Sequence, residues 1–348
     1  MLIKKNNLLT LDRFIEDSLY NKKFGYYMKK NPFGEKGDFI TAPNISILFS
    51  EMIAIWIISF WKHLKCPKRF NLIELGAGNG EMLRVLVDTF EKFPEFKKAC
   101  HVNIFEKSEL LKKLQKQNIK NKKIKWLDNL NELNNFPSIF IANEFFDALP
   151  IKQFIKKKKI WHERYVKLSI LKKYQYLDVP FDMQKFEKNI KIKISKEQKF
   201  IEYSPLTMTY LTEITKKIKS NNGGILIIDY GYTSKRIKNT LQAVSNHKYS
   251  DVLEAPGDSD ITYNLNFNLI NQIFDKLGTF SALKTTQNEF LTKLGIIQRA
   301  EILTNNMPFS KKADIYFRIK RLIDKNQMGY LFKVMFITKY NNKFKLGF

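Results

Sequence analysis

The sequence predicts an α/β protein with a doubly wound, mainly parallel sheet, an N-terminal helical extension and an inserted second lobe. An apolar run, Phe70 to Leu75, leads into glycines at alternate positions and then into the helical pattern Glu81 to Val87. This order is typical of a first parallel strand that delivers a ligand onto a helix N-terminus. Further strand-like apolar runs that end in polar residues occur at His101 to Glu106, Ile139 to Ala142 and Gly223 to Tyr232.

Length and composition indicate a large folded core. A chain of 348 residues with 44% hydrophobic residues exceeds what one core usually organises, so one large domain with an insertion or second lobe is expected. The formal charge of +26 would suggest a nucleic-acid partner, but only eight of the 60 basic residues are Arg, and Asn, Ile and Phe are abundant. This bias is typical of an AT-rich genome. We therefore expect a solvated basic surface rather than nucleic-acid binding, with Lys156 to Lys159 as a local basic run.

The cysteine pattern fits a reducing compartment, and the N-terminal sequence favours a protein that stays where it is made. Cys66 and Cys100 lie far apart without zinc-ligand spacing, so neither a metal site nor a disulfide framework is expected. The first residues show no signal peptide or presequence pattern. The most apolar stretch, Ile45 to Trp61, is short for a membrane span and contains Glu51, which favours a buried helix.

Residues 1–65 are expected to form a helical arm and a lid. A helix is predicted for Leu11 to Tyr20, and an aromatic loop with glycines follows from Phe24 to Pro43. This loop is either a lid over a ligand or an arm that packs on the core without touching one. Thr41 or Asn44 is expected to cap the following helix.

The glycines Gly76, Gly78 and Gly80 favour S-adenosylmethionine as the ligand. The dinucleotide fingerprint is G-x-G-x-x-G, but position 81 is Glu81, and Glu74 precedes the first glycine by two residues. A carboxylate at the strand end repels a pyrophosphate and tolerates an ammonium and a sulfonium. Glycines also let the backbone approach the methionine portion closely. Another nucleotide, or a plain strand-to-helix turn without a ligand, are the alternatives.

Glu106 ends the second predicted strand and is the candidate ligand of the cofactor ribose. A carboxylate at this place can accept hydrogen bonds from both ribose hydroxyls. The alternative is a surface carboxylate that caps the helix predicted for Glu109 to Gln117. A third strand is predicted for Ile124 to Asp128, with Asp128 or its neighbours near the adenine.

The stretch Ser138 to Pro150 is the candidate catalytic segment. Its buried strand ends in polar and aromatic residues, and the carboxyl ends of parallel strands are where open sheets bind ligands. Glu144 and Asp147 can hold a guanidinium or an amine by charge-assisted hydrogen bonds, while Phe145 and Phe146 form an apolar wall. The alternative is that the two carboxylates only begin a helix.

The rest of the chain supplies further candidates. Residues 153–221 are expected to form an inserted substrate-side lobe, in which Glu163 is a candidate ligand of a cationic target. Residues 66–152 and 222–348 are expected to form the cofactor-binding domain. Its returning strand carries Asp229 and Tyr230, which contact substrate or form a turn. Asp260 with Thr262 is expected to cap a helix near Asn266, and Leu331 to Lys339 is predicted to be an edge strand.

These motifs together resemble the MidA-like family of S-adenosylmethionine-dependent methyltransferases. The matching motifs occur in one order along almost the whole chain: Gly25-Tyr26-Tyr27, Gly37 to Pro43, Glu74 to Gly80, Asn143 to Pro150, Glu163-Arg164, Glu202 to Pro205, Asp229 to Gly231, Leu241 to Ala243, Pro256-Gly257, Asp260 to Thr262, and Gln287 with Glu289 to Leu291. The resemblance implies a class I methyltransferase with a Rossmann-like sheet. It also implies a protein arginine N-methyltransferase that dimethylates a core subunit of respiratory complex I and supports its assembly.

The resemblance completes the set of expected site residues. Glu144 and Asp147 are the catalytic candidates. The expected cofactor ligands are Glu74, Gly76, Gly78, Gly80, Glu106 and Asn143, and the expected substrate-binding residues are Asp38, Phe145, Phe146, Glu163, Asp229 and Tyr230. Two positions depart from the family pattern, because Asn44 stands where Glu is expected and Asn266 where Asp is expected. Each change removes a carboxylate, so a different substrate specificity is expected here if either carboxylate contacts a cationic substrate in relatives.

The absent presequence favours a cytoplasmic bacterial member, whereas the mitochondrial members act in the matrix. The implied protein partner is the homologous core subunit of the NADH dehydrogenase. Two alternatives remain: an RNA or DNA methyltransferase, suggested by the basic charge and by the aromatic residues after Asn143, and a cofactor-binding assembly factor with little catalysis. The target arginine, the degree of methylation and the oligomeric state, with a dimer as one option, are left open by the sequence.

Overall fold

The structure is a computed structural model that describes residues 8–34, 40–120, 123–171, 173–245, 248–278 and 280–348. The chain forms two compact units, each built from separate stretches. The sheet unit comprises Asn31–Phe145, Glu213–Gly231 and Thr279–Phe348, and the lobe unit comprises Met1–Lys30, Phe146–Thr212 and Tyr232–Gly278. The predicted division into residues 1–65, 66–152 with 222–348, and 153–221 draws its boundaries elsewhere and stays a prediction.

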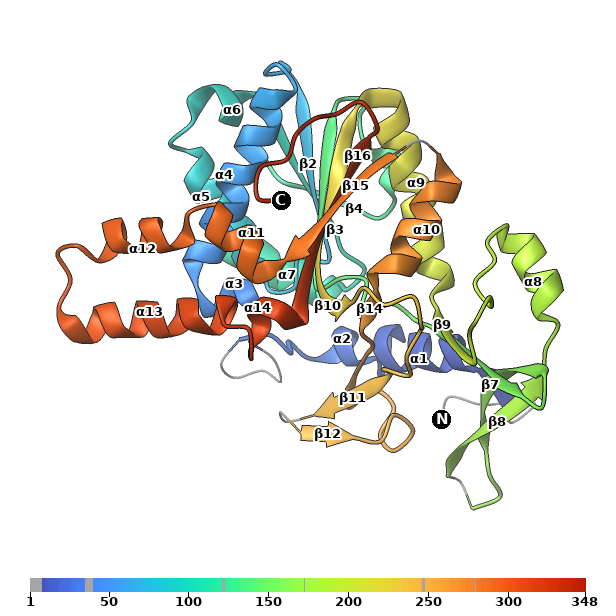
Figure 1. Ribbon diagram of the computed structural model, residues 1–348. Coiled ribbons are helices and arrows are strands. Elements are labelled where there is room, and N and C mark those ends of the chain that lie inside the picture. Colours follow the sequence, from blue (N-terminus) through green and yellow to red (C-terminus); the bar gives the residue numbers. More distant parts are fainter. Residues whose placement is uncertain (1–7, 35–39, 121–122, 172, 246–247, 279) are drawn as a thin grey trace. The chain divides into compact units, whose positions relative to one another are not determined.

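The sheet unit contains a doubly wound sheet (Figure 1). Its strand order is β15 (Phe280–Thr286), β16 (Phe332–Lys339), β10 (Gly223–Tyr232), β5 (Ser138–Asn143), β2 (Phe70–Leu75), β3 (Cys100–Phe105) and β4 (Lys125–Leu127). The five strands from β10 to β4 are parallel. Chain order runs from β2 outward through β3 to β4, and then from β5 outward to β10. The strand order therefore reverses between β2 and β5, where open sheets of this kind bind ligands.

The last strand is not the edge strand that the sequence predicts. β16 lies between β10 and β15 and is antiparallel to both. Six of its eight residues are buried, which fits an inner strand with both faces covered. The edge strand is β15. It pairs with β16, which is distant in sequence, so the local alternation of residues could not predict this pairing.

The helix α4 (Ile47–His63) is the buried helix that the sequence predicts. Its side chains share one hydrophobic core with those of α5 (Glu81–Phe90) and of strands β2, β5, β10 and β16. Figure 1 shows α4 and α5 on the same side of the sheet. The predicted cap is wrong: the Ser46 side chain accepts from the Leu48 backbone N–H, because a short helix, α3 (Ala42–Ile45), takes up Thr41 and Asn44.

The remaining elements of the sheet unit surround this core. They are α6 (Pro94–Ala99), α7 (Glu109–Asn118), the 3-10 helix η1 (Leu130–Glu132), α11 (Gln287–Lys293), α12 (Ile296–Thr304), α13 (Phe309–Ile323), α14 (Met328–Leu331) and the C-terminal half of α9 (Pro205–Asn221). The predicted second and third strands and the helix after Glu106 are confirmed as β3, β4 and α7.

The lobe unit is built on an antiparallel sheet. Its strands are β1 (Leu8–Thr10), β7 (Ile160–Leu168), β6 (Lys152–Lys157) and β9 (Phe200–Tyr203), with β8 (Tyr174–Pro180) on β7. The helices are α1 (Leu11–Tyr20), as predicted, α2 (Tyr26–Lys29), α8 (Met183–Ile190) and α10 (Phe267–Leu277), and a small second sheet holds β11 (Gln242–Ser245), β12 (Lys248–Ser250) and β13 (Asp260–Thr262). The short β14 is Leu265–Asn266. A cluster of Phe154, Phe181 and Phe186 rings packs at the sheet.

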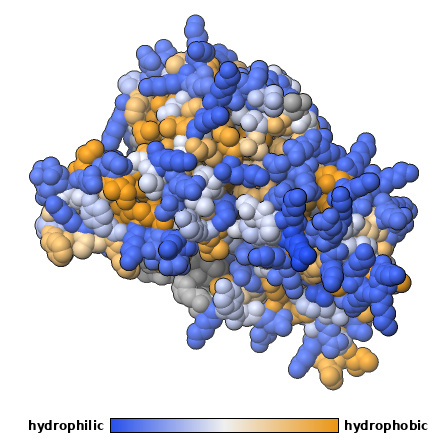
Figure 2. Space-filling model, viewed as in Figure 1, coloured by the Kyte–Doolittle hydropathy of each residue, from blue (hydrophilic) through white to orange (hydrophobic). Residues whose placement is uncertain are grey.

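The surface carries the basic excess. Figure 2 shows hydrophilic side chains over most of the visible face, interrupted by smaller hydrophobic areas. Most lysines in the described residues are exposed. Among these residues, no helix is long and apolar enough to cross a membrane.

Candidate functional site

The glycine loop after β2 has a backbone that requires glycine. Gly76, Gly78 and Gly80 have φ angles of 66°, 53° and 83°, in the left-handed region that other residues rarely adopt. A Cβ at Gly76 would lie 2.7 Å from the Phe145 ring, and one at Gly78 would lie 3.4 Å from the Phe33 ring. The loop is therefore a backbone-lined cradle bordered by two aromatic side chains, which fits the close approach of a ligand.

Glu74 lies at the carboxyl end of β2 and is 3% exposed. Its Oε2 atom has no hydrogen-bond partner among the described residues. Burial, and then the charge of Glu106, raise the pKa of the Glu74 carboxyl to about 8. A buried carboxyl group without a partner is costly unless something pairs with it. An ammonium or a sulfonium would supply this pairing, so the residues fit a cationic cofactor better than a pyrophosphate.

Glu106 follows β3 and is buried, which contradicts the alternative of a surface carboxylate that caps α7. Its Oε1 accepts from the Ser108 backbone N–H at 2.9 Å, while the Ser108 side chain caps α7 by accepting from the Leu111 N–H at 3.2 Å. Burial raises the pKa of Glu106, and the hydrogen bonds from Ser108 and Gln115 oppose this rise. β3 neighbours β2 in parallel register, so Glu106 follows a strand end adjacent to Glu74.

Gln115 was not predicted from the sequence. It lies on the buried face of α7, is fully buried, and donates from Nε2 to the Gly78 carbonyl at 2.9 Å and to Glu106 Oε2 at 3.1 Å. Its Oε1 accepts from Trp126 Nε1 at 2.9 Å. The sequence contains one indication of a buried polar role: Gln115 is a polar residue four positions after Leu111, on the apolar face of the predicted helix.

Asn44, one of the two departures from the family pattern, holds the glycine loop. Its Nδ2 donates to Thr41 Oγ1 at 2.8 Å, and its Oδ1 accepts from Asn79 Nδ2 at 2.9 Å. Asn118 at the end of α7 donates to the Asn79 carbonyl at 2.9 Å. A side-chain oxygen at position 44 therefore serves the loop, and both Asn and Glu can supply one.

The candidate catalytic segment begins at the end of β5, next to the point where the strand order reverses. Glu144 has a φ of 50°, and its N–H donates to the Ile228 carbonyl of β10 at 2.9 Å. Non-glycine residues in this region carry backbone strain, which is common at functional sites. The Asn143 Oδ1 is buried, and no hydrogen-bond partner for it occurs among the described residues.

The predicted substrate residues of the sheet unit lie on neighbouring strand ends. Asn143 is opposite Ile228 in the parallel register of β5 and β10, and Asp229 follows as a fully buried residue. Its Oδ1 accepts from the Tyr230 backbone N–H at 3.0 Å, a local turn-like contact. The Tyr230 ring packs edge-on against Phe332, with centroids 5.6 Å apart. The Phe145 ring lies edge-on to Phe105 at 6.5 Å.

Asp147 is the second residue of the part of this segment that belongs to the lobe unit, which begins at Phe146. It is buried, and its backbone carbonyl accepts from the Tyr263 N–H at 3.2 Å. The next carbonyl, that of Ala148, accepts from the Tyr20 hydroxyl at 3.0 Å. Phe146, before Asp147, is fully buried. Groups from α1 and from the stretch after β13 therefore fix the backbone of this turn.

Glu163 on β7 is engaged in an ion-pair network. The Lys152 ammonium lies 2.6 Å from Glu163 Oε1 and 3.1 Å from Asp12 Oδ1. A cationic target at Glu163 would have to compete with Lys152. The neighbouring Arg164 pairs with Asp178 at 3.0 Å.

Tyr27 and Asp260 form a second feature that was not predicted. The Tyr27 hydroxyl donates to Asp260 Oδ1 at 2.7 Å, and both side chains are buried. Burial and the Asp260 charge, with smaller effects of Tyr20 and Asp147, raise the pKa of Tyr27 well above its ordinary value. Asp260 lies in β13 and does not cap α10, so that prediction is wrong. The sequence could not predict this contact, because Tyr27 and Asp260 are 233 positions apart.

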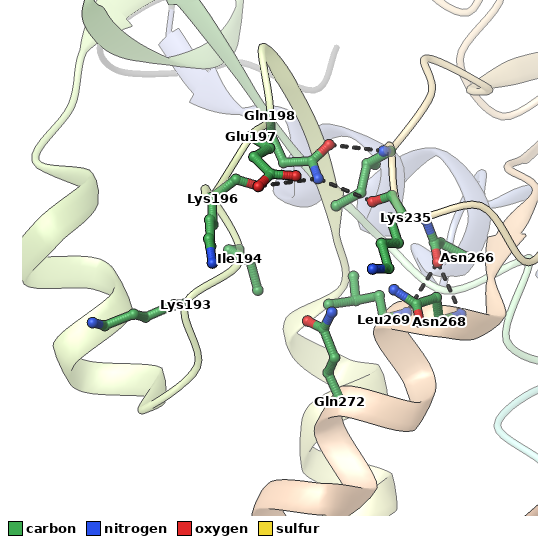
Figure 3. Close-up of a pocket in the computed structure, with 11 residues that line it drawn as sticks. Lys193, Ile194, Lys196, Glu197, Gln198, Lys235, Asn266, Asn268, Leu269 and Gln272 are labelled. Carbon is green, nitrogen blue, oxygen red and sulfur yellow. Dashed lines mark hydrogen bonds between the residues drawn. The ribbon is translucent and has the colours of Figure 1, made fainter.

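Asn266, the other departure, is the N-cap of α10. Its Oδ1 accepts from the Asn268 and Leu269 N–H groups at 2.9 Å each, and its Nδ2 donates to the Ser234 carbonyl at 3.2 Å. It also lines a cavity of about 280 Å³ in the lobe unit, shown in Figure 3, where the Lys235 and Gln272 side chains border the same space. None of the predicted site residues lines this cavity.

Two further points concern the predicted set. Asp38 lies outside the described residues. In the described part of the chain, no group of three or more His, Cys, Asp or Glu side chains could hold a metal ion.

Comparison with known proteins identifies the class. Residues 52–285, more than half of the chain, match the Methyltransf_28 family model, described as "Putative S-adenosyl-L-methionine-dependent methyltransferase". The chain belongs to this family of class I methyltransferases, and it is an enzyme whose cofactor is S-adenosylmethionine.

Particular relatives match over most of the chain. The protein arginine methyltransferase NDUFAF7 of Xenopus tropicalis mitochondria is 29% identical, covering 95% of this chain and 82% of the relative. The human protein of that name is 27% identical, covering 86% and 73%. A Burkholderia thailandensis protein, crystallised with S-adenosyl-homocysteine, has the same fold with a TM-score of 0.82 at 22% identity, covering 98% of this chain and 90% of that one.

Proposed function

We propose that this enzyme methylates arginine side chains of a protein. The observation that carries the proposal is the Glu144 carboxylate, on a strained backbone at the end of β5 beside the reversal of strand order, followed three residues later by the buried Asp147. The relatives named protein arginine methyltransferases support the choice of arginine over other nucleophiles.

The chemistry explains why two carboxylates are needed. S-Adenosylmethionine, when bound, supplies a methyl group on a sulfonium. The guanidinium of arginine is fully protonated in solution and is a poor nucleophile. We assign to Glu144 the tasks of orienting one guanidinium nitrogen and accepting its proton, and to Asp147 that of holding the remaining positive charge by a charge-assisted hydrogen bond. Phe145 and Phe146 would exclude water from this segment.

The cofactor residues follow from the sheet unit. Gly76, Gly78 and Gly80 would accommodate the methionine portion, Glu74 and Asn143 its polar groups, and Glu106 the two ribose hydroxyls. The fit rests on the positive φ angles of the loop and on the unpaired oxygens of Glu74 and Asn143 among the described residues. Asp229, Tyr230, Glu163 and Asp38 remain proposals for contacts with the target.

Glu144→Gln tests the catalytic assignment. The amide keeps the size of the side chain but cannot accept the guanidinium proton, so kcat should fall by about 100-fold or more, a loss typical for a group that acts mainly in the transition state. The dissociation constant of S-adenosylmethionine, measured by calorimetry, should stay within about twofold. Glu213→Gln, at an α9 residue outside the proposed site, is the matched control.

The outcomes separate the competing functions. Equal loss of turnover and of cofactor affinity would remove Glu144 from the catalytic role. Methylation of RNA or DNA in place of arginine would favour a nucleic-acid enzyme.

We further propose that the target is a core subunit of the respiratory NADH dehydrogenase in the bacterial cytoplasm, and that its methylation supports assembly of the complex. Rescue of assembly by Glu144→Gln would favour an escort function with little catalysis.

A further inference from the structure

One buried amide joins the two halves of the cofactor site. The Gln115 Nε2 atom carries two hydrogens, and one acceptor for each is present: the Gly78 carbonyl at 2.9 Å and Glu106 Oε2 at 3.1 Å. Gly78 lies in the loop assigned to the methionine portion, and Glu106 is the residue assigned to the ribose. Gln115 thus contacts both assigned regions from a single side chain of α7.

The orientation of this amide is fixed. Trp126, on β4, donates from Nε1 to Gln115 Oε1 at 2.9 Å. A flipped amide would place its oxygen against the Glu106 carboxylate and its NH₂ group against the indole N–H, which is unfavourable at both ends. The position of the Glu106 carboxylate is therefore set jointly by Gln115 and by the Ser108 N–H at 2.9 Å.

The backbone permits this arrangement because a glycine stands where α7 approaches the loop. A Cβ at Gly80 would lie 3.3 Å from the Gln115 Cα and 3.0 Å from Ile119 Cδ1. Both contacts are tight, so α7 and the loop could not keep this separation with a larger residue. Gln115 is fully buried, and an unsatisfied partner left behind by its removal would have no water to replace it.

We propose that Gln115 is a positioning residue for the cofactor, which aligns the Glu106 carboxylate and the Gly78 carbonyl together and so couples recognition of the ribose to recognition of the methionine portion. The proposal rests on the cofactor-binding role assigned to Glu106 and to the glycine loop. Gln115 acts through these groups and makes no contact with the cofactor in this account.

Gln115→Leu is the direct test, with S-adenosylhomocysteine and adenosine as probes in calorimetry or competition binding. We expect affinity for S-adenosylhomocysteine to fall by about 10-fold to 100-fold, the loss typical of a hydrogen bond to a charged group. Adenosine, which has the ribose but lacks the methionine portion, should lose about tenfold or less. The matched control is Gln117→Leu, at an exposed position of the same helix, which should change neither affinity by more than about twofold.

A double variant separates positioning from general destabilisation. With Glu106→Ala already present, Gln115→Leu should no longer affect adenosine binding but should still weaken S-adenosylhomocysteine binding through Gly78. Independent, multiplicative losses for adenosine would overturn the proposal. So would unchanged affinity for S-adenosylhomocysteine in a folded Gln115→Leu protein. If Glu106→Ala alone leaves adenosine binding intact, the ribose assignment itself fails, which is a separate result.

Trp126→Phe provides a milder second variant if Gln115→Leu does not fold. It removes the N–H that orients the amide together with part of the indole ring, and it keeps an aromatic ring on β4. Affinity for S-adenosylhomocysteine should fall several-fold, with the smaller effect again on adenosine. No loss in this folded variant would contradict the proposed orientation of Gln115.

Discussion

At the scale of single residues, the proposed role of Glu74 as a cofactor ligand makes cofactor binding depend on pH. Its pKa is raised from 4.5 to about 8, chiefly by burial. Between these two pH values the folded protein holds a proton that the unfolded chain has released, so this group makes the free protein less stable as pH rises. A bound cation favours the ionised carboxylate, and cofactor binding should therefore release a proton below pH 8.

We predict that the affinity for S-adenosylmethionine depends on pH. The affinity for S-adenosylmethionine should rise from pH 6 to pH 8, because less work is then needed to ionise Glu74, and should level off above pH 8. Glu74→Gln should flatten this rise and also reduce the loss of stability between pH 6 and pH 8, as measured by calorimetry and urea unfolding. Glu95→Gln, at an exposed residue of α6, is the control. A rise of the same size in Glu74→Gln would exclude Glu74 as its source.

The residues that were missed share one property. Gln115, Tyr27 and Asp260 acquire their roles from partners more than eight positions away in sequence. Glu74 and the glycines could be predicted, because a strand, a turn and a helix that follow one another directly fix their relative positions. The strand ends could be predicted for the same reason, whereas side-chain partners across the fold could not.

At the scale of elements, the turn from β2 to α5 depends on glycine conformation and on space. Gly76→Ala places a methyl group 2.7 Å from the Phe145 ring at a φ of 66°. We expect it to lower stability by about 1–2 kcal/mol and affinity for S-adenosylhomocysteine at least tenfold. The control is Gly295→Ala: Gly295 has a similar φ of 87°, but a Cβ there would have its nearest neighbour, Gln298 Oε1, 3.6 Å away. This variant should lose similar stability and keep its affinity for S-adenosylhomocysteine. Equal losses of affinity in the two variants would contradict the role of the glycine loop in cofactor binding.

Asn266, which stands where the family pattern has Asp, caps α10, and substitutions there test whether this position is structural or binds substrate. Asn266→Asp keeps the oxygen that accepts from Asn268 and Leu269 but loses the donor to the Ser234 carbonyl, so stability should fall by about 1 kcal/mol. Asn266→Ala loses both contacts and should cost about 2 kcal/mol in urea unfolding. If Asn266 has only a structural role, neither substitution should alter KM for the protein substrate. A lower KM in Asn266→Asp would instead indicate that relatives use this carboxylate for substrate.

The element pattern was largely readable from sequence. The first helix, the glycine turn and the parallel strands β2, β3, β5 and β10 follow from apolar runs with clear endings. The edge strand and the cap of α4 were predicted wrongly, because β15 pairs only through a distant contact and α3 interrupts the expected helix start. The local residue pattern therefore predicts where helices and strands occur, whereas the order of the strands in the sheet depends on contacts between distant residues.

At the scale of the whole molecule, composition and chemistry point to different partners. The charge of +26 is carried mainly by exposed lysines, whereas the groups assigned to the site are carboxylates, amides and aromatic rings. Carboxylates repel phosphate and attract a guanidinium, so the residues proposed for the site fit a cationic protein side chain better than a nucleic acid.

The most direct test of this account is mass spectrometry of the NADH dehydrogenase core subunits, purified from cells with and without this gene. We predict a methylated arginine that disappears with the gene, returns with the wild-type protein and does not return with Glu144→Gln. Absence of any such mark in both strains, while the purified protein still binds S-adenosylmethionine, would contradict arginine methylation of this target.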